Sequence, residues 1–327
     1  MEIKEQYLLE AKNLSKYFPV KNFFGKTIQQ VKAVDRVSLS IKRGETFGLV
    51  GESGCGKSTL GRTLIRMYEP TDGTLIYDGD DITKIKGKEL LSYHKRMQII
   101  FQDPYSALDP HQNVREIMAE PISVFEKLSE KEMEQRIVGL LEKVGMKADD
   151  MGKYAYEFSG GQRQRIGIAR ALSVHPEFLL CDEPISALDV SIQAQVVNVL
   201  EDLQKELGLT YLFVAHDLSM VRHISDRIGV MYLGTMVELA ESYELNRHPL
   251  HPYTKTLLSA VPVPDPRVSR SRQRIVLEGD IPSPMNPPSG CRFHTRCPYA
   301  TEKCKQVVPT FKEYEKGHWV ACHLLEE

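Results

Sequence analysis

The feature that most constrains this chain is a glycine-rich segment, GESGCGKST, at positions 51–59. An apolar run precedes it and a helical pattern follows it, the strand, loop and helix order of a phosphate-binding loop. The glycines let backbone N–H groups turn toward phosphate oxygens, and the positive end of the next helix adds to their attraction. A plain glycine turn would not explain both the motif and its context. We therefore predict that ATP or GTP is bound by Gly51, Gly54, Gly56, Lys57, Ser58 and Thr59, with Lys57 at the terminal phosphates and Ser58 as a Mg²⁺ ligand.

A second motif, FLLCDE at 178–183, is an apolar run that ends in two acids. Alone, such a run is more typical of a strand that enters a surface turn. Beside a phosphate loop it indicates a buried strand that delivers carboxylates to its carboxyl end, where phosphate-binding sheets place their ligands. We expect Asp182 to hold Mg²⁺, directly or through water, and Glu183 to orient or deprotonate the attacking water.

The order of the remaining motifs separates the classes of protein that share these two. FSGGQRQR occupies 158–165, SALD follows the acids at 186–189, and His216 ends the next apolar run. With these parts in this order, residues 7 to 260 resemble the ATPases of ABC transporters. The resemblance implies that Ser159, Gly160, Gly161 and Gln162, at the start of a helical run, bind the terminal phosphate of ATP held by an opposing subunit. One chain would then hold only half of each ATP site.

Further roles follow from the same resemblance. Gln102 matches the glutamine that ligates Mg²⁺ and couples the site to the membrane partner, and His216 matches the histidine that contacts the terminal phosphate. Asp189 matches the residue that links the two sites across the dimer. Phe18 occupies the aromatic position that stacks on adenine, although Tyr17 beside it leaves that assignment open. Taken alone, a histidine after a strand or an aromatic near the start of a chain would more often be structural.

Four of the six cysteines fall in the last forty residues. They lie among prolines, in a segment with few apolar residues to form a core, and such a segment needs a cross-link or a metal for stability. The spacing admits zinc or an iron–sulfur cluster, with His294, His318 and His323 as alternative zinc ligands, or unligated thiols. The candidate ligands are Cys291, Cys297, Cys304 and Cys322.

The segments 251–262, 279–284 and 290–298 resemble the C-terminal extension of dipeptide and oligopeptide importer ATPases. This implies a [4Fe-4S] cluster on the four cysteines, with zinc as the alternative. It also implies a second, related ATPase subunit, two membrane permease subunits and an extracellular substrate-binding protein as partners, with peptides as the cargo. Import of nickel or another small solute, and a non-transport ABC ATPase, remain alternative functions.

Composition bounds the rest. The formal net charge of -2 gives no reason to expect nucleic acid, and no apolar run is long enough to span a bilayer. We therefore expect a peripheral protein on the cytoplasmic face of the membrane. The predicted fold is an α/β phosphate-loop ATPase core with an antiparallel β subdomain and a helical subdomain at about 90–175, all within 1–260, followed by a Pro/Cys-rich domain at 261–327. That boundary predicts that Cys297→Ser leaves nucleotide affinity nearly unchanged.

Overall fold

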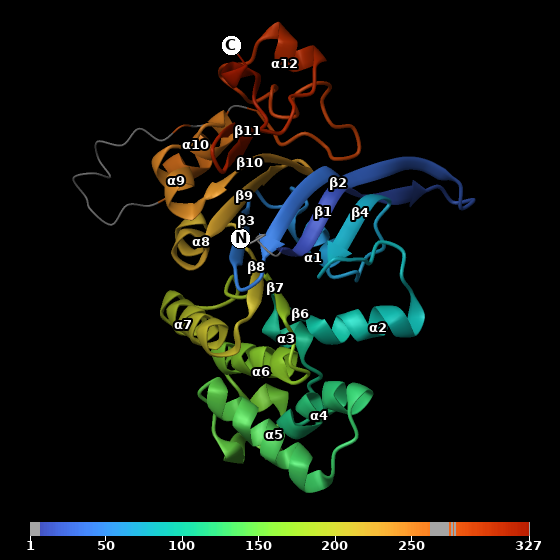
Figure 1. The fold of residues 1–327 in the computed structure, drawn as a ribbon, viewed down its shortest axis with the longest axis vertical. Helices are drawn as coiled ribbons and strands as arrows, with labels where there is room; N and C mark the ends of the chain where they lie inside the picture. Colours follow the sequence, from blue (N-terminus) through green and yellow to red (C-terminus); the bar gives the residue numbers. More distant parts are fainter. Residues whose placement is uncertain (1–6, 262–274, 276, 278, 327) are drawn as a thin grey trace, which may run out of the picture. The chain divides into compact units, whose positions relative to one another are not determined.

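The computed structural model describes residues 7–261, 275, 277 and 279–326. The chain divides into two compact units, each of which is described by itself (Figure 1). Unit 1 contains the residues up to Lys42, Thr46–Lys84 and Val214 onward, and unit 2 contains Arg43–Glu45 and Ile85–Phe213. The phosphate loop therefore belongs to unit 1, and the acidic motif to unit 2.

Unit 1 holds an antiparallel sheet with the strand order β2-β1-β4-β5. Its strands are β1 (Tyr7–Lys21), β2 (Thr27–Lys42), β4 (Asp72–Tyr77) and β5 (Asp80–Asp81). Apolar side chains such as Leu14 and Val37, which are partners in the β1–β2 register, are fully buried. The predicted antiparallel β subdomain is confirmed.

The second sheet of unit 1 carries the phosphate loop. Within this unit the strands follow the order β11-β12-β10-β9-β3, and β3 runs parallel to β9. Their bounds are β3 (Thr46–Val50), β9 (Arg227–Tyr232), β10 (Thr235–Glu241), β11 (Lys312–Glu315) and β12 (His318–Val320). The helices are α1 (Lys57–Leu64), α8 (Leu218–Ile224), α9 (Ser242–Arg247), α10 (Pro252–Ala260) and α12 (Glu302–Gln306). Gly234, with a left-handed φ of 82°, lies in the tight turn that joins β9 to β10 in an antiparallel hairpin.

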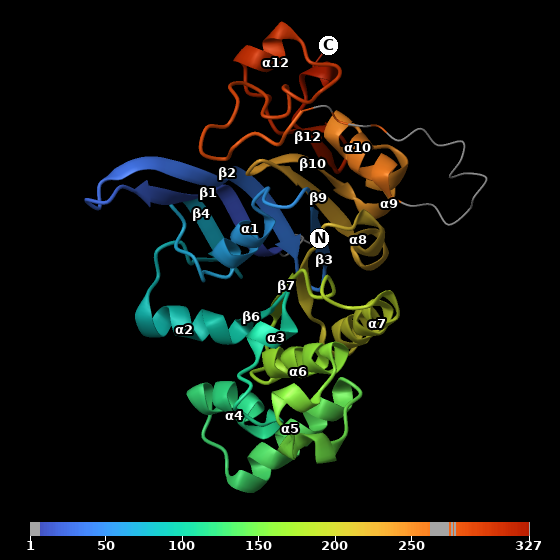
Figure 2. The ribbon, with the colours of Figure 1, turned by 180° about the vertical axis from the view of Figure 1, so that it is seen from behind.

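The C-terminal tail is part of this second sheet. Strand β12 pairs with β10 (Figure 2), and Glu238 lies opposite Val320 in that register. The fully buried carboxylate of Glu238 accepts hydrogen bonds from His318 Nε2 (2.7 Å) and from the backbone N–H groups of Leu250 and His251 (2.6 and 3.0 Å). A buried carboxylate with these three donors is well compensated, so it ties the tail to the body of unit 1. The boundary near residue 260 remains a prediction, and it does not separate two unconnected cores.

Unit 2 combines three strands with a group of helices. The strand order is β8-β7-β6, from β6 (Met97–Ile100), β7 (Phe178–Asp182) and β8 (Thr210–Val214). The helices are α2 (Gly87–Arg96), α3 (Pro104–Ala107), α4 (Val114–Phe125), α5 (Glu130–Lys143), α6 (Gly160–Leu172) and α7 (Val190–Leu207), with 3₁₀ turns η1 (Ala148–Gly152) and η2 (Ala155–Glu157). Helices α4, α5 and α6 pack on one another (Figure 2), and Ile137, Leu140 and Leu141 lie on the buried face of α5.

Capping residues fix where the helices of this group begin. Asn113 and Ser129 each close a reciprocal capping box with the glutamate three residues later, at the starts of α4 and α5.

Among the described residues, no helix has the length and apolar character needed to cross a bilayer.

Candidate functional site

The backbone of the phosphate loop can be built only with glycine at two positions. Gly56 has φ 107°, and a Cβ there would lie 2.1 Å from Ala33 O; Gly51 has φ 151°, and its Cβ would lie 2.2 Å from Met231 O. Gly56 is also the N-cap of α1 and provides no side chain to bond the first N–H groups of the helix. Those donors and the helix dipole are therefore directed at whatever anion the loop holds.

Lys57 lies inside the curve of the loop. Its side chain is buried, and its Nζ donates to Gly51 O (2.8 Å) and Glu52 O (3.1 Å). Ser58 and Thr59 follow in the first turn of α1 and are half-buried. The ammonium therefore lies at the loop where phosphate oxygens would bind. Those oxygens would compete with the two carbonyls for its hydrogen bonds.

Glu52 is the member of the loop whose importance the sequence did not reveal. Its N–H donates to Tyr253 Oη at 2.8 Å, and its carboxylate accepts from Arg296 Nη1 and Nη2 at 2.8 and 3.3 Å. The side chain of Arg296 is 9% exposed and that of Glu52 is 25% exposed. A residue of the cysteine-rich tail therefore contacts the phosphate loop directly.

The two aromatic candidates for adenine stacking are engaged differently. Tyr17 donates its hydroxyl to Asp35 Oδ1 at 2.6 Å. Phe18, the next residue of β1, is half-buried and packs edge-on against Tyr68, with the ring centroids 5.5 Å apart and Lys16 Nζ over the ring at 5.0 Å. Because successive side chains of a strand point to opposite faces, only one of the two can face adenine, and Tyr17 is committed to Asp35. Stacking by Phe18 stays a prediction, with Tyr17 now the weaker candidate.

The acidic motif lies in unit 2, where the sequence placed it at the end of a buried strand. All of β7 is buried, including Asp182, and Glu183 follows with the left-handed φ of 48°. A non-glycine residue in that region is strained, and such strain is common at functional sites. Gln102, just after β6, donates its Nε2 to Glu183 Oε2 at 2.8 Å. The structure therefore brings together two predicted site residues that are 81 positions apart. His216 is exposed after β8 and belongs to unit 1.

The signature segment starts α6. Ser159 is its N-cap, and its hydroxyl oxygen accepts from Gln162 N (3.4 Å) while Gln162 Oε1 accepts from Ser159 N (3.0 Å). The hydroxyl of a serine that accepts in this way keeps its own proton as a donor. Gly161 lies against the start of α7, and a Cβ on it would come within 2.4 Å of Ile192 Cγ2. Packing therefore requires glycine here, independently of any phosphate.

Asp189 lies close to the signature segment in the same unit. It is the exposed N-cap of α7, three residues before Ile192, and it makes no side-chain capping bond. Val190 beside it is 82% exposed. The predicted signature and dimer-coupling residues thus form one exposed region of unit 2.

The four tail cysteines lie near one another in unit 1, since each of the other three thiols affects the pKa of Cys291. Cys304 is on α12, and Cys322 precedes the 3₁₀ turn η3 (His323–Leu325). Backbone N–H groups two residues further on donate toward the sulfurs of Cys291, Cys297 and Cys322. Burial, with a smaller contribution from the other three thiols, raises the pKa of Cys291 to about 11.

The sulfurs do not form a compact single-ion site. In the part of the chain that the structure describes, the one group of three ligand atoms lying within 4.8 Å of one another is Glu244, Glu315 and His318. The sulfurs around tetrahedral zinc lie about 3.8 Å apart, given a Zn–S distance near 2.3 Å. The thiol arrangement therefore does not fit a zinc ion as it stands. A cavity of 1010 Å³ borders this region and β1, β2 and β10, but no phosphate-loop residue lines it.

Comparison with known proteins defines the class. The ABC transporter family profile matches residues 34–186, and the profile of the oligopeptide/dipeptide transporter C-terminal region matches residues 237–304. Two solved structures share the fold with a TM-score of 0.64 each. They are cbiO1 from Clostridium perfringens, part of the ABC transporter complex cbiONQ (28% identity, 75% of this chain and 92% of that one), and the dimeric ATP-binding cassette MJ0796 bound to ADP and Pi (26% identity, 72% and 98%). The fold and its motifs are those of an ABC ATPase, as predicted.

Full-length relatives then fix the family. The chain is 54% identical to the oligopeptide transport ATP-binding protein AppF of Bacillus subtilis (98% of both chains) and 57% identical to the putative oligopeptide transport ATP-binding protein YkfD of the same organism (97% of this chain and 95% of that one). It is 49% identical to the OppF protein of Haemophilus influenzae over 97% of both chains. The chain belongs to the ATP-binding subunits of oligopeptide and dipeptide ABC transporters, which hydrolyse ATP to energise peptide import.

Proposed function

We propose that this subunit is one half of a composite ATPase on the cytoplasmic face of the membrane, and that its partner is a related ATPase chain. The observation that carries this proposal is the exposed start of α6. Ser159 caps the helix with its oxygen and retains a hydroxyl proton, beside the exposed Asp189 region. An anion-binding helix start that is directed outward suits the phosphate of an ATP held by another subunit.

In this proposal the chain's own residues have separate roles. Lys57 and the loop N–H groups hold the β- and γ-phosphates, and Glu183 orients the attacking water and accepts its proton. His216 contacts the γ-phosphate. When bound, Mg²⁺ neutralises charge on the phosphates, and the all-oxygen donors of Ser58, Gln102 and Asp182 suit this cation.

Gln102 connects catalysis to the state of the site. In this structure its amide donates to the Glu183 carboxylate, so it occupies a hydrogen-bond position that a catalytic water would use. When Mg²⁺ is bound, Gln102 would help to hold it, and the Glu183 oxygen that accepts from Gln102 in this structure would then be able to orient the water. Since Gln102 begins the segment leading into the helices of unit 2, this exchange offers a route by which ATP binding reaches the permease subunits.

We further propose that the four tail cysteines hold a [4Fe-4S] cluster with a structural role. Mutual interaction of the thiols, backbone N–H groups directed at three sulfurs, and separations wider than a single ion needs all favour a multi-atom cluster over zinc. Nothing in ATP hydrolysis requires its redox chemistry.

The test is an affinity purification of the chain from membranes under anaerobic conditions, with co-purifying proteins identified and iron, sulfide and zinc assayed. We expect two permease chains, a sister ATPase and about four irons and four sulfides per chain. Replacement of Gln102 by Ala should leave the permease chains bound, because Gln102 transmits the state of the site and does not by itself hold the partner.

Recovery of ribosomes, or of no membrane protein, would contradict the proposed assembly. Zinc in place of iron would contradict the cluster while leaving the ATPase assignment intact.

A further inference from the structure

Two arginines of the cysteine-rich tail reach the nucleotide-binding part of unit 1 from one short turn. Arg292 follows Cys291, and Arg296 precedes Cys297. Arg296 forms the two-pronged contact with Glu52 of the phosphate loop described above. A bidentate arginine–carboxylate pair fixes direction as well as distance, because the planar guanidinium matches the carboxylate at two atoms.

The backbone of Arg296 is hydrogen-bonded to Phe293, whose ring packs against two tyrosines. Its N–H donates to Phe293 O at 3.0 Å, and the Phe293 ring is fully buried against Tyr232 and Tyr253, with centroid distances of 5.2 and 5.4 Å. Tyr253 in turn accepts the hydrogen bond from Glu52 N. Glu52 is therefore hydrogen-bonded at its backbone by Tyr253 and at its side chain by Arg296, and both of these residues contact Phe293.

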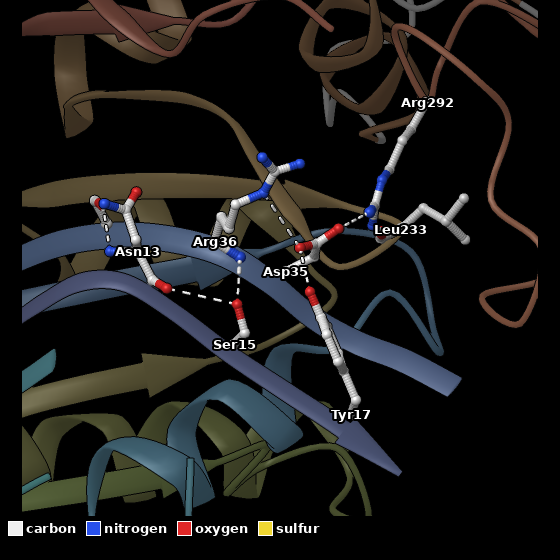
Figure 3. A network of polar contacts seen from close by, with 8 residues as sticks. Asn13, Ser15, Tyr17, Asp35, Arg36, Leu233 and Arg292 are labelled. Carbon is white, nitrogen blue, oxygen red and sulfur yellow. Dashed lines mark hydrogen bonds and ion pairs between the residues drawn. The ribbon is translucent and has the colours of Figure 1, made fainter. Parts of the chain in front are cut away.

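The second arginine, Arg292, contacts Asp35 on β2, the strand that pairs with the one carrying Phe18. Arg292 donates to Leu233 O and to the Asp35 carboxylate, which also receives the hydroxyl proton of Tyr17 (Figure 3). Burial alone would raise the pKa of Asp35, but the hydrogen bond from Tyr17 and the charge of Arg292 hold it below its ordinary value. The network connects Arg292 through Asp35 to Tyr17, the neighbour in β1 of Phe18, which is the candidate for adenine stacking.

We propose that the turn from Cys291 to Cys297 is a positioning element for ATP, and that Arg296 sets the conformation of the phosphate loop through Glu52. This inference rests on the assignment of that loop as the ATP site. Glu52 is next to Gly51, and its carbonyl accepts from Lys57, so a shift of Glu52 moves the backbone that cradles the phosphates. Ligation of the cysteines then affects ATP affinity, which reverses the expectation drawn from the sequence for Cys297→Ser.

A double-mutant cycle tests the pair. ATP dissociation constants are measured by calorimetry for the full chain with Glu52→Gln, with Arg296→Gln and with both changes. Each single change should weaken ATP binding by roughly three- to thirtyfold, the range of mutational effects on coupled sites. The double variant should be no weaker than the weaker single variant, and Arg296→Lys should recover part of the loss.

Lys305→Gln is the matched control, because Lys305 pairs with Glu302 within α12 and does not contact the loop. Glu52→Gln leaves the tail intact, so its affinity remains informative even where a tail variant folds poorly. Two results would overturn the inference, provided that the wild-type protein binds ATP. One is that the losses of ATP affinity in the two single variants add up in the double variant, and the other is that neither single variant loses affinity. Failure of the wild-type protein to bind ATP would overturn the proposed function as well.

Cys297→Ser extends the test to the cysteines. We expect weaker ATP binding in the wild-type background and no further loss in the Arg296→Gln background, since the effect passes through that arginine. Equal losses in both backgrounds would show that the cysteines act without Arg296 and would overturn the link.

Discussion

Replacement of Glu183 by glutamine is expected to leave ATP binding intact and to lower the rate of ATP hydrolysis by about 10²- to 10⁴-fold, the usual contribution of a positioned base. Glutamine keeps the size of the side chain and its bond to Gln102, but it cannot accept the proton of the attacking water. The rate is measured by phosphate release from the assembled complex. In the proposed composite ATPase, ATP binding would close the two subunits on each other and hydrolysis would reopen them, so the variant complex should also remain in a closed, ATP-bound state.

Glu206→Gln serves as the control for loss of a carboxylate. Glu206 is an exposed acid of α7 that pairs with Lys143, and its replacement should leave hydrolysis unchanged. Turnover by Glu183→Gln close to that of the wild-type complex would rule out Glu183 as the base.

Lys57→Gln is expected to weaken ATP binding by about ten- to a hundredfold. A hydrogen bond to a charged group contributes roughly 1.5–3 kcal/mol, and each 1.4 kcal/mol is a factor of about ten in affinity. Glutamine can still bond to the loop carbonyls that Lys57 contacts, so the loop should keep its shape while losing the charge. The measurement is ATP titration of the isolated chain, with the melting temperature as the test of folding.

An exposed lysine of α2, Lys88, provides the comparison for loss of one positive charge, and Lys88→Gln should bind ATP as the wild-type protein does. Wild-type affinity in Lys57→Gln would contradict the assignment of the phosphate loop. A large fall in melting temperature would instead show that Lys57 is needed for the loop itself.

The sequence predicted those parts of the site whose chemistry is local. A glycine loop between a strand and a helix, and an apolar strand that ends in Asp182-Glu183, are short patterns with one physical interpretation, and the structure has both elements where they were expected. The strained backbone of Glu183 and its bond to Gln102 could not be read in this way. They depend on the pairing of β6 with β7, which brings residues 81 positions apart to the same edge.

Long-range contacts account for what the sequence missed. Prolines and a change in composition near residue 260 suggested an independent tail, yet β12 pairs with β10 and Arg296 reaches Glu52 across 244 positions. No periodicity or spacing encodes such a contact. The preference for Phe18 over Tyr17 likewise rests on Asp35, in the neighbouring strand, which accepts the Tyr17 hydroxyl. In each case the missing information was a partner far away in the chain.

The most direct test of the central claim is uptake of a labelled oligopeptide by vesicles that contain the purified complex, with its substrate-binding protein and ATP supplied on the appropriate sides. We predict uptake that requires ATP, is lost in the Glu183→Gln complex and does not occur with nickel ions in place of the peptide. ATP hydrolysis without peptide uptake, or uptake that persists in the Glu183→Gln complex, would contradict the account.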